Sequence, residues 1–141
     1  LQPTFVAFTP WHTLDSYAAL ISTLLELNMV NNVPSIQLAI RLLIPAGSCL
    51  LEAPEVNRLI GEFEPRSLGY PWRHSDSRVD ELQREIQTTI EHAGNSTDRP
   101  EIFARICELL EPRLEQPIAL PEVTTVRPRA TIPYLSEPWY C

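Results

Sequence analysis

One apolar run, residues 35–45 (SIQLAIRLLIP), limits what this chain can fold into more than any other segment. Large aliphatic side chains recur in it at every second position, at Ile36, Leu38, Ile40, Leu42 and Ile44. A period of two places such side chains on one face of an extended strand. The alternate positions carry smaller, polar and charged groups, at Gln37, Ala39, Arg41 and Leu43. The pattern therefore predicts a β-strand with one apolar face and one mixed face.

A second, shorter run near the start, residues 4–8 (TFVAF), is also apolar and rich in β-forming residues, so it predicts a buried strand. Between the two runs, Thr13 is placed to cap a helix that ends near Asn28. A strand, a helix and a strand in so short a stretch form a βαβ unit, whose strands run parallel with a right-handed crossover. The expected fold class is α/β.

The middle of the chain has helical periodicity. It predicts a helix from Pro54 to about Phe63, one from Ser77 to about His92, and one from Asp98 to about Glu111. Ser77 and Asp80 have the spacing of a capping pair for the second of these helices. From Pro112 onward repeated prolines prevent a long helix. We therefore divide the chain into an α/β part, residues 1–52, a helical extension, residues 53–111, and an extended proline-rich tail, residues 112–141.

Composition excludes several function classes. The net charge of −7 argues against nucleic-acid binding, which needs a basic surface. All 11 basic residues are arginine, which is typical of a GC-rich bacterial gene. The three cysteines, Cys49, Cys107 and Cys141, have neither metal-site nor disulfide spacing, and this favours a reducing, cytoplasmic setting. No apolar run is long enough to predict a membrane span. Cys49 and Cys107 lie among apolar residues and are expected to be buried.

The loops that follow the two predicted strands are candidates for chemistry, because parallel sheets place working loops at the carboxyl ends of their strands. The first loop carries Trp11 and His12, which would line a substrate site or else lie in solvent. Gly47, in the second loop, would serve a tight turn or contact a cofactor. Arg41 would bind a ligand carboxylate from the mixed face of its strand, or pair with a nearby acidic residue of the chain itself.

Four segments together resemble a known family. FVAFTPWHTLDSY, residues 5–17, and IRLLIPAGSCLLE, residues 40–52, are similar to late strand–loop–helix elements of radical S-adenosylmethionine (radical SAM) barrels. YPWRHSDSRVDELQREI, residues 70–86, and the final EPWYC are similar to the subgroup with a CUAEP/CCAEP tail. The resemblance implies that the chain holds the last two β/α units of a radical SAM barrel, followed by a helical extension and the tail.

The resemblance also implies roles for single residues. Arg41, Gln37 and Gly47 would contact S-adenosylmethionine, Trp11 and His12 would line the substrate, and Cys141 would be the first functional residue of a redox-active tail. The parent enzyme would use a 4Fe-4S cluster to cleave S-adenosylmethionine reductively. The family's Cys-x3-Cys-x2-Cys motif does not occur in this chain, so we expect the chain itself to bind no cofactor and to be inactive. Its substrate and any use of cobalamin stay open.

Two further expectations concern the chain as a whole. It looks like a piece of a longer protein, and unpaired strand edges should make it a homodimer. A different reading is a non-catalytic helical protein-interaction module, in which residues 35–44 form a core helix and the tail docks as a peptide. Parallel strands at residues 4–8 and 35–44 would favour the first reading.

Overall fold

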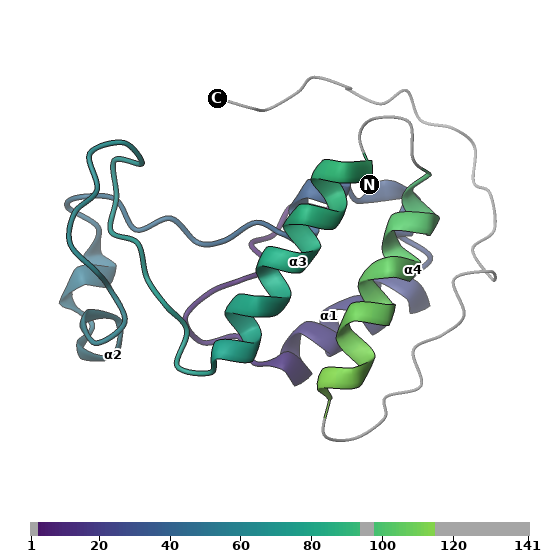
Figure 1. Ribbon diagram of the computed structural model, residues 1–141, viewed down its shortest axis with the longest axis horizontal. Coiled ribbons are helices and arrows are strands. Elements are labelled where there is room, and N and C mark those ends of the chain that lie inside the picture. Colours follow the sequence, from purple (N-terminus) through teal and green to yellow (C-terminus); the bar gives the residue numbers. More distant parts are fainter. Residues whose placement is uncertain (1–2, 94–97, 115–141) are drawn as a thin grey trace.

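The computed structural model describes residues 3–93 and 98–114, and the described part of the chain is built from helices and loops without a β-strand. Three helices form the main body: α1 (Leu14–Glu26), α3 (Ser77–Ala93) and α4 (Arg99–Leu110). In Figure 1, α3 and α4 lie side by side, and α1 packs behind them. The expected α/β fold, a βαβ remnant of a barrel, is therefore wrong.

Helix α1 begins and ends where local sequence dictates. At its start, Thr13 and Ser16 form a reciprocal capping box, in which each side chain accepts a hydrogen bond from the other residue's backbone N–H, at 3.1 and 2.8 Å. At its end, Asn28 adopts a left-handed conformation with φ 53°. The Met29 N–H then reaches the carbonyl of Leu24, the bond that closes a Schellman motif. The predicted helix is confirmed.

The two long C-terminal helices are also confirmed, with one change at a cap. The side chain of Asp76, rather than that of Ser77, accepts the hydrogen bond from Arg78 N–H that caps α3. Asp80, expected to cap the same helix, instead accepts a bond from His74 N–H at 2.9 Å. Hydrogen bonds from Arg78 hold the pKa of the Asp76 carboxyl below its ordinary value.

The main core lies between these helices. Its largest fully buried side chains come from α1, α3, α4 and the segments that precede and follow α1. Phe8 stacks on Tyr17, with ring centroids 4.8 Å apart, and this contact ties the N-terminal segment to α1. The core members that define it are Phe8, Tyr17, Ile21, Leu82, Ile86, Phe103, Ile106 and Leu110.

The run 35–45 does not form the expected strand. Its first part is the 3-10 helix η2 (Ser35–Leu38), which follows the short 3-10 helix η1 (Val30–Asn32). Residues 4–8 and 35–44 touch at a single parallel bridge between Phe8 and Arg41. The next rung of a parallel ladder with residues 4–8 would use the carbonyl of Leu38, which accepts instead from the Tyr17 hydroxyl at 2.9 Å. With this acceptor already satisfied, the bridge does not extend into a strand pair.

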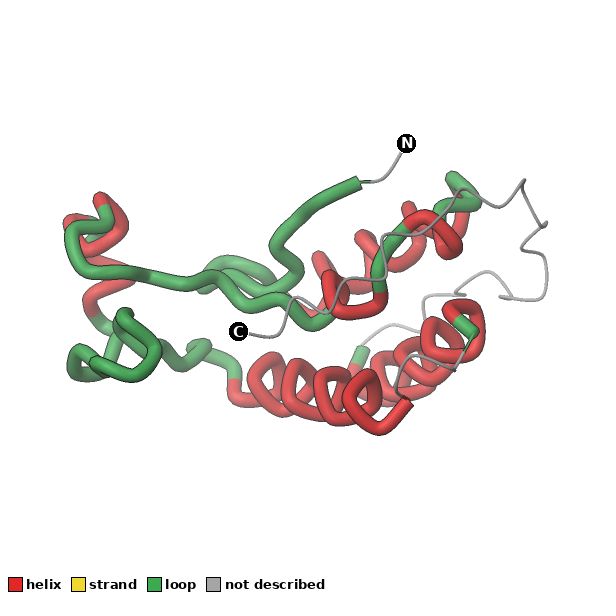
Figure 2. The backbone as a smooth tube through the Cα atoms, turned by 90° about the horizontal axis from the view of Figure 1, so that it is seen from above, coloured by secondary structure: helices red, strands yellow, loops and turns green. Residues whose placement is uncertain are grey.

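Residues 42–74 form a separate projection, here called the arm, which extends to one side of the helices in both views (Figures 1 and 2). It contains the 3-10 helix η3 (Cys49–Glu52) and the short helix α2 (Pro54–Asn57), so the predicted helix to Phe63 ends early. Its small core consists of Ile44, Val56 and Trp72. Isolated antiparallel bridges, such as Ile60 with Trp72, close the arm on itself.

The last described element is the 3-10 helix η5 (Glu111–Arg113), directly after α4. Most of the predicted tail, residues 112–141, lies outside the described residues. The division of the chain at residues 52 and 111 stays a prediction.

Candidate functional site

Arg41 lies at the junction between the arm and the helices and makes polar contacts with residues distant in sequence. Its Nη1 donates to Oδ1 of Asp80 at 2.7 Å, and its Nη2 donates to the carbonyl of Trp72. Its Cζ lies 3.6 Å from the centre of the Trp72 ring, which is cation–π stacking. We call Arg41, Trp72, His74 and Asp80 the Arg41 junction.

Each other member of the junction is fixed from a second side. Trp72 Nε1 donates to the carbonyl of Leu42 at 2.8 Å, so the ring is held against the segment that carries Arg41. Asp80 uses its second oxygen, Oδ2, to accept the backbone N–H of His74 at 2.9 Å. Both oxygens of Asp80 are therefore engaged, and the carboxylate joins the first turn of α3 to the end of the arm.

Partial burial makes the junction stronger than a surface ion pair. The side chains of Arg41 and Asp80 are 25% and 18% exposed, against 50% for Arg78 in its pair with Asp76. Screening by solvent is weaker at such a site, although water still reaches both groups. The guanidinium predicted to bind a ligand carboxylate thus contacts a carboxylate of this chain, and a ligand would have to compete with Asp80.

Trp11 and His12 lie in a turn organised by Thr9. The Oγ1 of Thr9 lies 3.1 Å from Nδ1 of His12, and His12 N–H donates to the carbonyl of Thr9. Trp11 is 51% exposed and His12 is half-buried. No hydrogen bond, ion pair or ring contact within the described residues joins either side chain to Arg41, so the structure does not bring these candidates together.

Gln37 and Gly47, the other two candidate cofactor contacts, lie in different surroundings. The Oε1 of Gln37 is buried and accepts no hydrogen bond from any described residue. Gly47 is exposed with φ 79°, and a Cβ built there would meet nothing within 4 Å. Glycine at this position therefore serves the backbone turn, since a positive φ is costly for other residues. Cys141, the candidate catalytic residue, lies outside the described residues.

The two described cysteines differ in exposure. Cys107 is buried in α4 as predicted, whereas Cys49 is exposed, and the prediction for it is wrong. Burial, with smaller effects from Glu111 and Glu108, raises the pKa of the Cys107 thiol to about 11. Such a thiol stays protonated at neutral pH and is a poor nucleophile. Burial also raises the pKa of the Tyr17 hydroxyl, which donates to the carbonyl of Leu38 at 2.9 Å.

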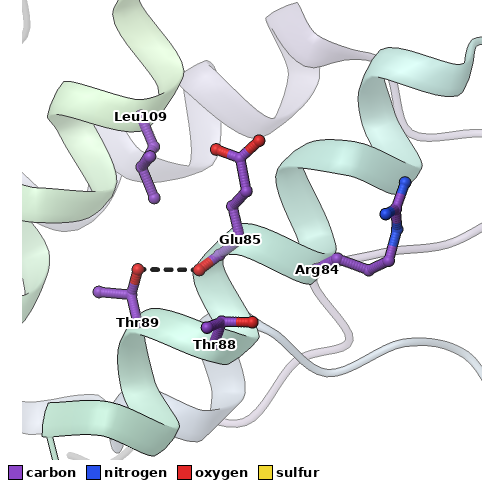
Figure 3. A pocket seen from close by; sticks show the side chains of 5 residues that line it. All are labelled: Arg84, Glu85, Thr88, Thr89 and Leu109. Carbon is purple, nitrogen blue, oxygen red and sulfur yellow. Dashed lines mark hydrogen bonds between the residues drawn. The ribbon is translucent and has the colours of Figure 1, made fainter.

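An open hollow of about 370 Å³ lies between α3 and α4, lined by Arg84, Glu85, Thr88, Thr89 and Leu109 (Figure 3). Thr89 donates its hydroxyl to the carbonyl of Glu85 at 2.8 Å, and the Glu85 carboxylate accepts from Arg113 at 2.6 Å. Figure 3 shows Glu85 reaching toward Leu109 while Arg84 extends away from it. The groups that could act as acid or base are thus already paired, and the hollow has no catalytic constellation.

Among the described residues there is neither a candidate metal site nor a candidate membrane span. No group of three or more histidine, cysteine or acidic side chains in residues 3–93 and 98–114 is placed to hold a metal ion. No helix in these same ranges has the length and apolarity needed to cross a membrane.

Comparisons with known proteins leave the family open. No protein-family model matches the chain, and no curated protein or solved structure is significantly similar to it. The resemblance to radical SAM proteins therefore continues to depend on the residues quoted for it.

Sequence reasoning missed the partners of Arg41. Asp80 follows it by 39 positions and the Trp72 carbonyl by 31, so no local spacing links them. The only signal was chemical: a basic residue inside an apolar run needs an acidic partner, because a buried charge without one is costly.

Proposed function

We propose that this chain is a non-catalytic portion of a radical SAM enzyme of the CUAEP/CCAEP-tail subgroup. What supports the proposal is the relation between the two segments that carry most of the resemblance. Phe8 and Arg41, one from each segment, form a parallel bridge, in which Phe8 N–H donates to the Ile40 carbonyl at 2.9 Å and Leu42 N–H donates to the Phe8 carbonyl at 2.8 Å. Helix α1 connects the two segments and packs on Phe8 through Tyr17. Segments far apart in sequence that resemble neighbouring elements of one family are thus neighbours here.

In this proposal the described residues hold segments of the chain in place and do not take part in the reaction. The Arg41 junction fixes the segment after the bridge and, through Asp80, the start of α3. Contact of Arg41 with the carboxylate of S-adenosylmethionine would bring a second carboxylate to a guanidinium that is already paired with Asp80. Cys141 remains the candidate redox group.

The described side chains do not fit a 4Fe-4S cluster. Such clusters are held by several thiolates close together. Cys49 lies in the arm and Cys107 is buried in α4. No step of a radical reaction is therefore assigned to these residues, and the cluster and S-adenosylmethionine belong, in this proposal, to other parts of the enzyme.

The experiment that tests the family assignment is sequencing of the genomic region that encodes residues 1–141. The proposal expects the same reading frame to encode a Cys-x3-Cys-x2-Cys motif upstream of Leu1 and Ala-Glu-Pro downstream of Cys141. A start codon next to Leu1, with no cluster motif in the frame, would reject it.

A helical protein-interaction module is the second candidate. It is favoured by the fold, since the parallel strands at residues 4–8 and 35–44 that would have favoured the first reading are not formed in the described part of the chain. Sequencing separates the two candidates, because only the first requires the cluster motif. Under either candidate we propose a cytoplasmic location, from the unpaired cysteines.

A further inference from the structure

Within residues 3–93 and 98–114, the segment from Ile40 to Ile44 is hydrogen-bonded along only one of its two backbone edges. The Ile40 carbonyl accepts from Phe8 at 2.9 Å, the Leu42 N–H donates to Phe8 at 2.8 Å, and the Ile44 carbonyl accepts from Tyr70 at 2.8 Å. The residues between them, Arg41 and Leu43, make no backbone hydrogen bond with any residue in the described ranges. Alternate residues of an extended segment direct their N–H and C=O groups to opposite edges. The second edge therefore presents four backbone groups that have no partner among the described residues.

This open edge is short because both of its ends are blocked. On one side, the next carbonyl of the edge, that of Ala39, already accepts from Gln83 Nε2 at 3.1 Å, so α3 covers it. On the other side, Pro45 has no N–H to offer. A long peptide strand would meet α3 at one end and a missing donor at the other. The edge suits a partner whose own free edge is equally short.

We propose that this edge binds a second copy of the chain, as an antiparallel pair around a two-fold axis at Leu42. In that arrangement Arg41 of each copy faces Leu43 of the other, and the N–H and C=O of both residues are hydrogen-bonded. The edge is its own complement, which is the condition for a two-fold contact. This inference is independent of the proposed function, because it depends only on backbone groups present in the chain.

The side chains at the edge favour the same arrangement. Leu43 is 76% exposed, the highest value among the large apolar side chains described. Pairing brings it beside Arg41 of the second copy, whose guanidinium lies flat on the Trp72 ring. Leu43 thereby loses contact with water against a flat, weakly hydrated surface. Each copy carries a net charge of −7, so repulsion opposes association and added salt should strengthen it.

Sedimentation equilibrium of the 141-residue chain, under reducing conditions because Cys49 is exposed, tests the proposal. We expect a monomer–dimer equilibrium at micromolar concentrations. Leu43→Lys places a lysine opposite Arg41 of the second copy and should weaken the dimer at least about tenfold. Leu68→Lys is the matched control, since it makes the same change at a leucine of the arm that is 70% exposed and precedes Tyr70, whose N–H bonds the opposite edge at Ile44. It should leave the dimer unchanged.

Hydrogen exchange locates the contact directly. The amides of Arg41 and Leu43 should become protected as concentration rises, whereas the Leu42 amide, bonded to Phe8, should be protected at every concentration. Leu43→Pro provides a second variant, because it removes an N–H that has no partner within the described part of the chain. A chain that stays monomeric, or a dimer that survives both Leu43 variants with these two amides unprotected, would overturn the proposal.

Discussion

Replacing Arg41 with alanine should lower the stability of the protein more than any other single arginine substitution in the described residues. The change removes an ion pair to Asp80, a hydrogen bond to the Trp72 carbonyl and the stacking on the Trp72 ring. It also leaves a carboxylate that is 18% exposed with one oxygen unpaired. The arm would then be joined to the helices mainly by the chain itself and by the apolar contacts of Trp72.

The magnitude follows from these three losses. A hydrogen bond to a charged group contributes roughly 1.5–3 kcal/mol, and cation–π stacking adds roughly 0.5–2 kcal/mol. Water reaches a quarter of the Arg41 side chain, at 25% exposure, and this reduces the sum. The free energy of unfolding should therefore fall by about 2–3 kcal/mol. Arg41→Lys keeps the charge but loses the planar guanidinium and its stacking, so the free energy of unfolding should fall by about half as much.

Urea unfolding followed by circular dichroism measures the change, provided that the slope against denaturant stays constant. Arg78→Ala is the matched control, because its ion pair with Asp76 is made by a side chain that is 50% exposed. Exposed ion pairs contribute about 0–1 kcal/mol, so the free energy of unfolding of the control variant should change little. If Arg41→Ala and Arg78→Ala lose the same small amount, the junction does not stabilise the protein and our reading of Arg41 is incorrect.

Three further substitutions test other parts of the core. Tyr17→Phe removes the donor to the buried Leu38 carbonyl and should cost about 1–3 kcal/mol in urea unfolding, so an unchanged midpoint would show that water replaces it. Since burial raises the pKa of Cys107 to about 11, its thiol ionises at lower pH in the unfolded chain than in the folded one. The free energy of unfolding should therefore be constant below about pH 9 and fall as the pH rises toward 11, and Cys107→Ala should reduce this fall. Gln37→Met removes a buried oxygen without a described partner and should raise stability by up to about 2 kcal/mol, whereas a loss would reveal a partner that Gln37 needs.

The helices could be predicted because their signals are local. The capping pair of Thr13 and Ser16, the left-handed Asn28 and the periodic apolar stripes all act within a few residues of one another. The predicted bounds of α1, α3 and α4 consequently differ from the structure by one or two residues. At the start of α3 two acidic residues compete, and Asp76 caps the helix while Asp80 binds Arg41 and His74.

The prediction of a strand at residues 35–44 was wrong because the conformation of this segment depends on residues distant in sequence. Alternation predicts a buried face, but Ile36 is 39% exposed and Ala39, on the other face, is buried. The donors that take its carbonyls come from Tyr17, Gln83 and Trp72, none of which is identifiable from the run itself. Of the candidate site, sequence identified Arg41 as unusual in its setting and could not identify its partners.

We propose that this chain is a non-catalytic portion of a radical SAM enzyme, and reductive cleavage of S-adenosylmethionine is the reaction that tests this proposal. The protein encoded by the entire reading frame and the 141-residue chain should both be treated with iron, sulfide and dithionite, and methionine release should then be measured. We expect cluster-bound iron and methionine release from the former and neither from the latter. Methionine release from the 141-residue chain, or its absence from an iron-loaded protein encoded by the entire frame, would contradict it.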